Sequence, residues 1–139
     1  MKVKQIMSQN VACVEPTLPI SKAAEKMLEL DVGFLPICEN DGLLGTVTDR
    51  DITIRAIPQG LDPRLTPVRD IMTQSVFFCY EDDDVDYVGR YMQEKEVRRM
   101  LILNRRKKLV GVVSLGDIAK TSGEEELAGE TLGEIAEAA

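Results

Sequence analysis

The sequence predicts an α+β fold in which one β-α-β-β-α unit occurs twice, and an internal repeat is the main observation behind this prediction. The segment Val3–Val11 (VKQIMSQNV) returns as Val68–Val76 (VRDIMTQSV), 65 positions later. Farther along, the offset becomes 66, and Leu43–Thr48 (LLGTVT) matches Leu109–Ser114 (LVGVVS). A constant offset with a single step at a turn indicates a tandem duplication, because chance similarity would not keep its register over so many positions.

The duplication predicts two copies that stabilise each other. A unit of about fifty to sixty residues buries only a marginal core, so we expect the copies to pack face to face with pseudo-two-fold symmetry. The predicted organisation is repeat 1 over residues 1–58, a linker containing proline and glycine over 59–67, repeat 2 over 68–121 and an acidic tail over 122–139.

Each copy is expected to begin with a short strand and an amphipathic helix. The strands are predicted at Val11–Val14 and Val76–Tyr80, and the helices at about Pro19–Leu30 and Asp84–Lys95. Apolar residues recur at helical spacing, namely Ile20, Ala23, Ala24, Met27 and Leu28 in the first helix and Val85, Val88, Tyr91 and Met92 in the second. The acidic run Asp82–Asp84 is interpreted as capping the second helix rather than as a metal site.

A hairpin and a second helix complete each copy. The predicted strand pairs are Phe34–Cys38 with Leu43–Thr48, and Met100–Leu103 with Leu109–Ser114. The second helices are expected to begin at Asp49 and Leu115, directly after the hairpins.

Composition narrows the range of partners and chemistries. The chain has 139 residues, 17 Lys and Arg against 24 Asp and Glu, a net charge of −7 and no histidine. Six of the acids and none of the bases follow Lys120, so residues 1–120 have a net charge of 17 − 18 = −1. A local phosphate site is therefore possible in the body of the chain, whereas no nucleic acid and no membrane are expected as partners. Without histidine, Ser-His-Asp and Cys-His nucleophile systems are excluded.

No apolar run reaches bilayer length and the first residues have no secretory leader, so a cytoplasmic location is expected. The three cysteines are too few for a disulfide scaffold. Cys13 and Cys38 lie on strands that could be neighbours, which makes a redox-sensitive disulfide conceivable, although two separate buried thiols are the expected state in a reducing compartment.

The turn from each hairpin into its second helix has the strongest local signal. A hydroxyl residue precedes an aspartate by three positions in both copies, as Thr48 and Asp51 and as Ser114 and Asp117. A phosphate would suit the free N–H groups of this turn, and the carboxylate could accept hydrogen bonds from ribose hydroxyls. The same spacing is that of a capping box, in which the two side chains close the helix N-terminus. Spacing alone does not separate these two interpretations.

The order of these motifs resembles a known family. Ile-Met in each leader, the strand Leu35-Pro36-Ile37 and the segment Gly-Thr-Val-Thr-Asp-Arg-Asp-Ile at Gly45–Ile52 are similar to the CBS domain, named for cystathionine β-synthase. The tandem resembles a CBS pair, or Bateman module, over nearly all of residues 3–120, as in stand-alone bacterial and archaeal CBS-pair proteins. This resemblance implies a regulatory, non-catalytic protein that binds an adenosine ligand (AMP, ADP, ATP, S-adenosylmethionine or NAD) in clefts between the repeats.

The resemblance also implies a role for particular residues. Asp51 and Asp117 would hold the ribose, and Thr48 and Ser114 the phosphate. Adenine would lie among Val11, Ala12, Pro36, Val76, Phe77 and Leu101. The basic residues Arg98 and Arg99 of repeat 2 would contact phosphate. Repeat 1 has Gly33-Phe34 in their place, where Arg50 partly substitutes, so the two sites should differ.

The family further implies a homodimer and a regulated partner protein, and two alternatives stay open beside it. One is a ligand-free interaction module whose Thr-x-x-Asp turns are only helix caps. The other is a carboxylate-based hydrolase that uses Asp49 and Asp51, which is disfavoured because no metal-ligand cluster surrounds them. The tail is expected to be either an amphipathic helix or a frayed acidic end.

Overall fold

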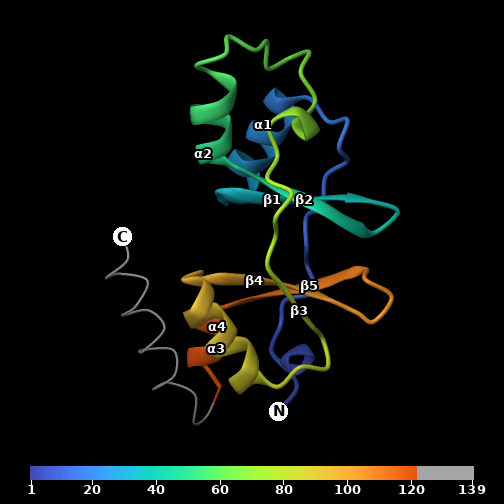
Figure 1. Cartoon of the computed structure of the whole chain (residues 1–139), viewed down its shortest axis with the longest axis vertical. Helices are drawn as coiled ribbons and strands as arrows, with labels where there is room; N and C mark the ends of the chain where they lie inside the picture. The colour runs from blue at the N-terminus through green and yellow to red at the C-terminus, as the bar shows by residue number, and fades with distance from the viewer. Residues whose placement is uncertain (122–139) are drawn as a thin grey trace. The chain divides into compact units, whose positions relative to one another are not determined.

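The computed structural model describes residues 1–121, which form two compact units. Unit 1 contains Met1–Val11 and continues from Phe77, whereas unit 2 contains Ala12–Val76. The chain therefore enters unit 2 after Val11 and leaves it after Val76 (Figure 1). Helices and small sheets occur together in both units, which confirms the predicted α+β class. The predictions for the tail lie outside the described residues.

Unit 2 combines a two-stranded antiparallel sheet with one long helix. Its elements are α1 (Ile20–Leu30), β1 (Phe34–Glu39), β2 (Gly42–Thr48), α2 (Asp49–Asp51), the π-helix η2 (Ile52–Ala56) and the 3₁₀ helix η3 (Val68–Asp70). The hairpin pairs from Phe34 with Thr48 to Glu39 with Gly42. From α1, Ile20, Ala23 and Met27 enter the core as predicted, whereas Leu28 is 83% exposed.

Unit 1 combines a three-stranded mixed sheet with two helices. Its elements are the 3₁₀ helix η1 (Val3–Gln5), β3 (Phe78–Tyr80), α3 (Val85–Lys95), β4 (Arg99–Leu103), β5 (Leu109–Ser114) and α4 (Leu115–Ala119). The strand order is β3-β4-β5, with β3 parallel and β5 antiparallel to β4. Figure 1 shows α3 and α4 beside this sheet, and both helices contact it. Within residues 1–121, no helix has the length and apolarity needed to cross a membrane.

The leader of each repeat, which is the repeated segment Val3–Val11 or Val68–Val76, lies in the unit that contains the hairpin of the other repeat. The amide of Val3 donates to the carbonyl of Asp83 over 2.8 Å, and the amide of Val68 donates to the carbonyl of Leu18 over the same distance. Val3 and Val68 are fully buried in the cores of unit 1 and unit 2, respectively. Complete removal of these apolar side chains from water stabilises the arrangement by about 1.5–3 kcal/mol each.

Two glycines allow the leaders to approach the hairpins closely. The leader residue Ser8 exchanges two backbone hydrogen bonds with Val112 of β5, and Thr73 exchanges two with Thr46 of β2, all of 2.8–3.0 Å. A Cβ atom on Gly45 would lie 2.5 Å from the Thr73 carbonyl oxygen, and one on Gly111 would lie 2.9 Å from the Ser8 carbonyl oxygen. The glycine that recurs in both hairpins is therefore required by backbone proximity.

The predicted first strand of repeat 1 is wrong except at Val14, which makes a single parallel bridge to Ile37. Val14 donates to the Pro36 carbonyl and accepts from the Cys38 amide, both over 2.9 Å. The next bond of a parallel ladder would need an N–H at position 36, which proline lacks. Repeat 2 has Leu101 at this position, and there β3 pairs with β4 over three residues.

The acidic run of repeat 2 stands at the start of α3, but its side chains act differently from the prediction. Asp84 occupies the N-cap position without a side-chain capping bond, and its carboxylate lies 3.7 Å from the Lys2 ammonium. Asp83 accepts from the Tyr80 amide over 2.8 Å, and Asp82 pairs with Arg105 at 2.9 Å. These acids therefore fix the loop before the helix rather than cap the helix itself.

Candidate functional site

The turn between β2 and α2 in unit 2 is a closed capping box. The Thr48 hydroxyl oxygen accepts from the Asp51 amide over 3.0 Å, and the Asp51 carboxylate accepts from the Thr48 amide over 2.9 Å through Oδ2. Two amides that would otherwise lack partners at the helix start are thereby satisfied. The capping interpretation of this spacing is confirmed.

The turn between β5 and α4 in unit 1 has the same geometry. The Ser114 hydroxyl oxygen accepts from the Asp117 amide over 3.1 Å, and Asp117 Oδ2 accepts from the Ser114 amide over 2.9 Å. The two turns are equivalent positions of the duplication, and both use a hydroxyl and an acid in the same way.

Capping does not consume the whole binding capacity of these side chains. Each hydroxyl acts in the cap as an acceptor, so its proton stays available for donation to an anion. Each carboxylate accepts the capping bond through Oδ2, and an ionised carboxylate has further acceptor positions on its second oxygen. A capping box can thus offer one donor and one charged acceptor to a ligand that approaches the turn.

The two turns differ in how the second carboxylate oxygen is used. In unit 2, Asp51 Oδ1 lies 3.6 Å from Arg55 Nε and 3.5 Å from the Thr73 hydroxyl, and Asp51 is only 6% exposed. Arg55 also donates to the carbonyls of Ile71 and Met72 over 3.1 Å. The carboxylate of Asp51 is therefore held inside unit 2 on both of its oxygens.

In unit 1, Thr121 stands at the position equivalent to Arg55, so Asp117 has no equivalent arginine beside its second carboxylate oxygen. Asp117 is half-buried, and among the described residues its carboxylate accepts a hydrogen bond only from the Ser114 amide. It lines a pocket of about 470 Å³ together with Met1, Gln5, Ile6, Lys120 and Thr121. Asp117 is thus the more available of the two acids.

The predicted phosphate-contacting arginines lie at the same end of the unit 1 sheet as Ser114. Arg99 is the cross-strand partner of Ser114 in the pairing of β4 with β5, and the carbonyl of Arg98 accepts from the Leu115 amide over 3.1 Å. Both arginine side chains are exposed. Unit 1 therefore brings the backbone of Arg98 and Arg99 beside the turn that carries the Ser114 hydroxyl and the Asp117 carboxylate.

The corresponding end of unit 2 is more acidic. The Asp49 amide donates to the Gly33 carbonyl over 2.9 Å, and a Cβ on Gly33 would lie 3.0 Å from the Asp49 carboxylate. This close approach favours glycine at position 33, which is equivalent to Arg98 of repeat 2. Arg50 is exposed on the turn, and its amide donates to Asp49 Oδ1 over 2.8 Å.

The predicted adenine-contacting residues divide between the two units. Ala12, Pro36 and Val76 belong to unit 2, and Val11, Phe77 and Leu101 belong to unit 1. Pro36 and Leu101 are buried at equivalent positions of β1 and β4. Phe77 is 42% exposed, with the Lys95 ammonium 5.2 Å from its ring centre. The other three are half-buried and adjoin the points where the chain passes between the units.

The cysteines of repeat 1 are placed differently from the expectation of two separate buried thiols. Cys13 is exposed, Cys38 is buried, and their sulfur atoms lie 2.9 Å apart. Cys79 is buried in unit 1. Within residues 1–121, no group of three His, Cys, Asp or Glu side chains is placed to hold a metal ion.

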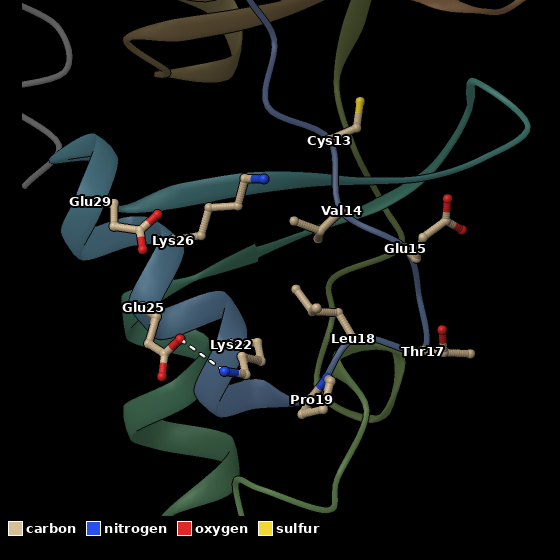
Figure 2. Close-up of a pocket in the computed structure, with 10 residues that line it drawn as sticks. All are labelled: Cys13, Val14, Glu15, Thr17, Leu18, Pro19, Lys22, Glu25, Lys26 and Glu29. Atoms are coloured by element: carbon tan, nitrogen blue, oxygen red, sulfur yellow. Dashed lines mark hydrogen bonds and ion pairs between the residues drawn. The ribbon is translucent and has the colours of Figure 1, made fainter.

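A further pocket of about 560 Å³ lies in unit 2 between α1 and the segment that precedes it (Figure 2). It is lined by Cys13, Val14, Glu15, Thr17, Leu18, Pro19, Lys22, Glu25, Lys26 and Glu29. Its charged side chains have both signs, and Lys22 pairs with Glu25 at 3.3 Å. No predicted site residue lines this pocket.

Two residues that shape the unit 2 turn escaped the sequence interpretation. Arg55 follows Asp51 by four positions, a spacing that places an acid and a base on one helical face, so this pair could have been found. Thr73 belongs to the leader of the other repeat, and the sequence gives no signal of its approach to Asp51.

The fold and the two equivalent turns define a protein of two duplicated α+β domains, each with a capped strand-to-helix turn. The family model of the CBS domain matches residues 3–56 and 68–124, and the chain belongs to this family.

Three similar proteins place the chain among CBS-pair proteins. The CBS domain-containing protein YhcV of Bacillus subtilis is 35% identical over 133 residues, which cover 96% of this chain and 94% of that protein. The crystal structure of Hypoxic Response Protein I with two coordinated zinc ions is 33% identical with a TM-score of 0.77, covering 86% of this chain and 98% of that one. The CBS domain pair of protein MJ0100, in complex with 5-methylthioadenosine and S-adenosyl-L-methionine, is 26% identical with a TM-score of 0.71, covering 86% and 94%.

Proposed function

We propose that this protein is a non-catalytic, regulatory binder of an adenosine ligand, of the class of AMP, ADP, ATP, S-adenosylmethionine or NAD. The observation on which the proposal mainly rests is the turn of unit 1, where Ser114 and Asp117 form the cap and the backbone of Arg98 and Arg99 adjoins it. Membership of the CBS family and the adenosine compounds bound to the CBS pair of MJ0100 support the same ligand class.

Each residue of the unit 1 turn has a chemical role in the proposal. Asp117 accepts hydrogen bonds from ribose hydroxyls through Oδ1, since Oδ2 already serves the cap. Ser114 donates its hydroxyl proton to a phosphate or to a comparable polar group. The guanidinium groups of Arg98 and Arg99 bind phosphate oxygens, for which their planar donors are suited. Adenine packs on Val11, Phe77 and Leu101, the predicted adenine-contacting residues that belong to unit 1.

The unit 2 turn is proposed to bind more weakly. A ligand at Asp51 would have to compete with Arg55 and Thr73 for Oδ1, and the turn has a second acid in Asp49. Arg50 supplies one exposed cation, compared with two at the unit 1 turn. We therefore expect unequal affinities, with the site at Asp117 filled first.

A binder of this kind acts as a sensor. A ligand shifts a conformational equilibrium only by as much as it binds one state more tightly than the other, and a second protein can read the shift. We propose that the protein works in the cytoplasm as a homodimer and signals occupancy to a regulated partner protein.

Titration calorimetry and thermal unfolding with the five compounds test the proposal. At least one compound is expected to give binding heat and to raise the unfolding temperature, because a ligand at a hundred times its Kd stabilises the folded state by about 2.7 kcal/mol. If folded protein, checked by circular dichroism, gives neither response with any compound, the turns are helix caps only and the sensor proposal is wrong.

A further inference from the structure

The strand bridge of unit 2 brings two cysteines together. Val14 is bonded on both sides to β1, to the Pro36 carbonyl and the Cys38 amide, and across this parallel bridge Cys13 and Cys38 are diagonal neighbours. The result is a distance of 2.9 Å between the sulfur atoms of Cys13 and Cys38, although 24 residues separate them in the chain. This proximity depends on backbone hydrogen bonds rather than on side-chain packing alone.

The two thiols differ in access. Cys13 is exposed and stands at one end of the pocket beside α1, where Figure 2 shows its sulfur pointing away from the helix side chains. Cys38 is 5% exposed and lies on β1. A reagent from solution can therefore reach the sulfur of Cys13 first.

The thiols also differ in acidity, in the direction that suits this order. The hydrogen bond from the Cys38 thiol lowers the pKa of Cys13, although burial and the carboxylates of Asp41 and Glu15 oppose the effect. The same hydrogen bond, together with burial, raises the pKa of Cys38 well above its usual value. Because the thiolate is the reactive form, Cys13 is the thiol that reacts first with an oxidant, and Cys38 is the resolving thiol that then attacks the oxidised Cys13 sulfur.

We propose that Cys13 and Cys38 form a redox-active dithiol that a hydroperoxide converts into a disulfide. The Cys13 thiolate attacks the terminal peroxide oxygen, the O–O bond breaks, and Cys13 becomes a sulfenic acid while hydrogen peroxide is reduced to hydroxide. The sulfur of Cys38 then attacks the Cys13 sulfur, an S–S bond forms, and the sulfenic oxygen leaves as water with the Cys38 proton. Two thiols have lost two electrons, and the peroxide has gained them.

The disulfide would close a loop that contains all of α1. A cross-link of this kind restricts the unfolded chain, so the oxidised protein should unfold at a higher temperature than the reduced protein. The dithiol would thus record exposure to peroxide as a change in the stability of unit 2.

Cys79 provides an internal control in the same molecule. It is 2% exposed, and burial raises its pKa to about 12. In the folded protein it should therefore not react with peroxide and should react only slowly with an alkylating reagent. Any selectivity for Cys13 and Cys38 over Cys79 is therefore a property of their site rather than of cysteine in general.

The test treats the fully reduced chain with hydrogen peroxide, blocks remaining thiols with iodoacetamide in denaturant, and measures intact and peptide masses. We expect the loss of two hydrogen atoms, a linked peptide pair containing Cys13 and Cys38, and alkylated Cys79. In Cys38→Ser, Cys13 should accumulate as a sulfenic acid that dimedone traps, and Cys79→Ser should behave as the parent. Equal alkylation of all three cysteines after peroxide would overturn the proposal, as would oxidation of Cys13 to higher acids without the linked pair. The result on the parent chain decides the question even if Cys38→Ser does not fold.

Discussion

Gly45→Ala tests whether the leader of repeat 2 packs on the hairpin of repeat 1, as the structure has it. A Cβ at this position would lie 2.5 Å from the Thr73 carbonyl oxygen, whereas ordinary contacts begin at 3.4 Å, so the atoms would be 0.9 Å too close. That oxygen accepts the 2.9 Å bond from the Thr46 amide, and the Thr73 amide donates back over 2.8 Å. The backbone of the leader would have to move away from the hairpin.

The expected destabilisation can be worked out from these contacts. Overpacking of this kind costs about 1–3 kcal/mol, and weakening of the two bridge bonds adds about 1 kcal/mol each at most. Replacement of glycine by alanine returns about 0.4–1 kcal/mol by restricting the unfolded chain. With each contribution near the middle of its range the net loss is about 2 kcal/mol, which lowers the urea midpoint by about 1 M for a slope of about 2 kcal/mol/M.

Urea unfolding followed by circular dichroism measures this loss, since the chain has no tryptophan. Gly116→Ala is the matched control, because among residues 1–121 its Cβ would meet only Ser114 Oγ at 3.5 Å, and it would stand inside α4. The control is expected to stabilise by about 0.5–1 kcal/mol. If Gly45→Ala unfolds at the same midpoint as the parent, the close approach of Thr73 to the hairpin is refuted.

Two further predictions concern single side chains. Arg55→Met should destabilise the chain by about 1–3 kcal/mol in the same urea assay, because the Ile71 and Met72 carbonyls lose their hydrogen-bond donor. The control Arg64→Met changes an exposed side chain and should stay within about 0.5 kcal/mol of the parent. Equal midpoints for both variants would contradict a stabilising role of the Arg55 hydrogen bonds. The Arg105 guanidinium, hydrogen-bonded to Asp82, holds the pKa of that carboxyl below its ordinary value, so its contribution to stability is present at neutral pH and is lost as the pH falls through the lowered pKa. Asp82→Asn should therefore lower the unfolding midpoint near neutral pH but not in strong acid, and a difference that is constant with pH would count against the ion pair.

The sequence predicted the order of elements well, because a duplication presents each hydrophobic pattern twice. It could not predict which unit a leader joins. Val3 and Val68 stand in nearly identical segments, so a leader that packs on its own hairpin and one that packs on the other hairpin have the same sequence pattern. Only the chain path in three dimensions, with its crossings after Val11 and Val76, distinguishes them.

The sequence predicted that the two candidate sites differ in their basic residues, but it did not predict the difference between Asp51 and Asp117. The spacing of Thr48 with Asp51 and of Ser114 with Asp117 predicts two equal turns. What separates them is the use of Asp51 Oδ1 by Arg55 and Thr73, and the second of these comes from a distant part of the sequence. The predicted strand Val11–Val14 is reduced to the single bridge at Val14 for a local reason, the absent N–H of Pro36.

The most direct test of the account compares ligand binding by the parent, Asp117→Asn and Asp51→Asn in titration calorimetry. Asparagine keeps an oxygen for the capping bond but lacks the charge, and a hydrogen bond to a charged group is worth about 1.5–3 kcal/mol. For whichever of AMP, ADP, ATP, S-adenosylmethionine and NAD binds the parent, Asp117→Asn should therefore raise Kd about ten- to a hundred-fold, and Asp51→Asn should change the tighter site little. If Asp117→Asn binds that compound as tightly as the parent, the unit 1 turn is not the ligand site.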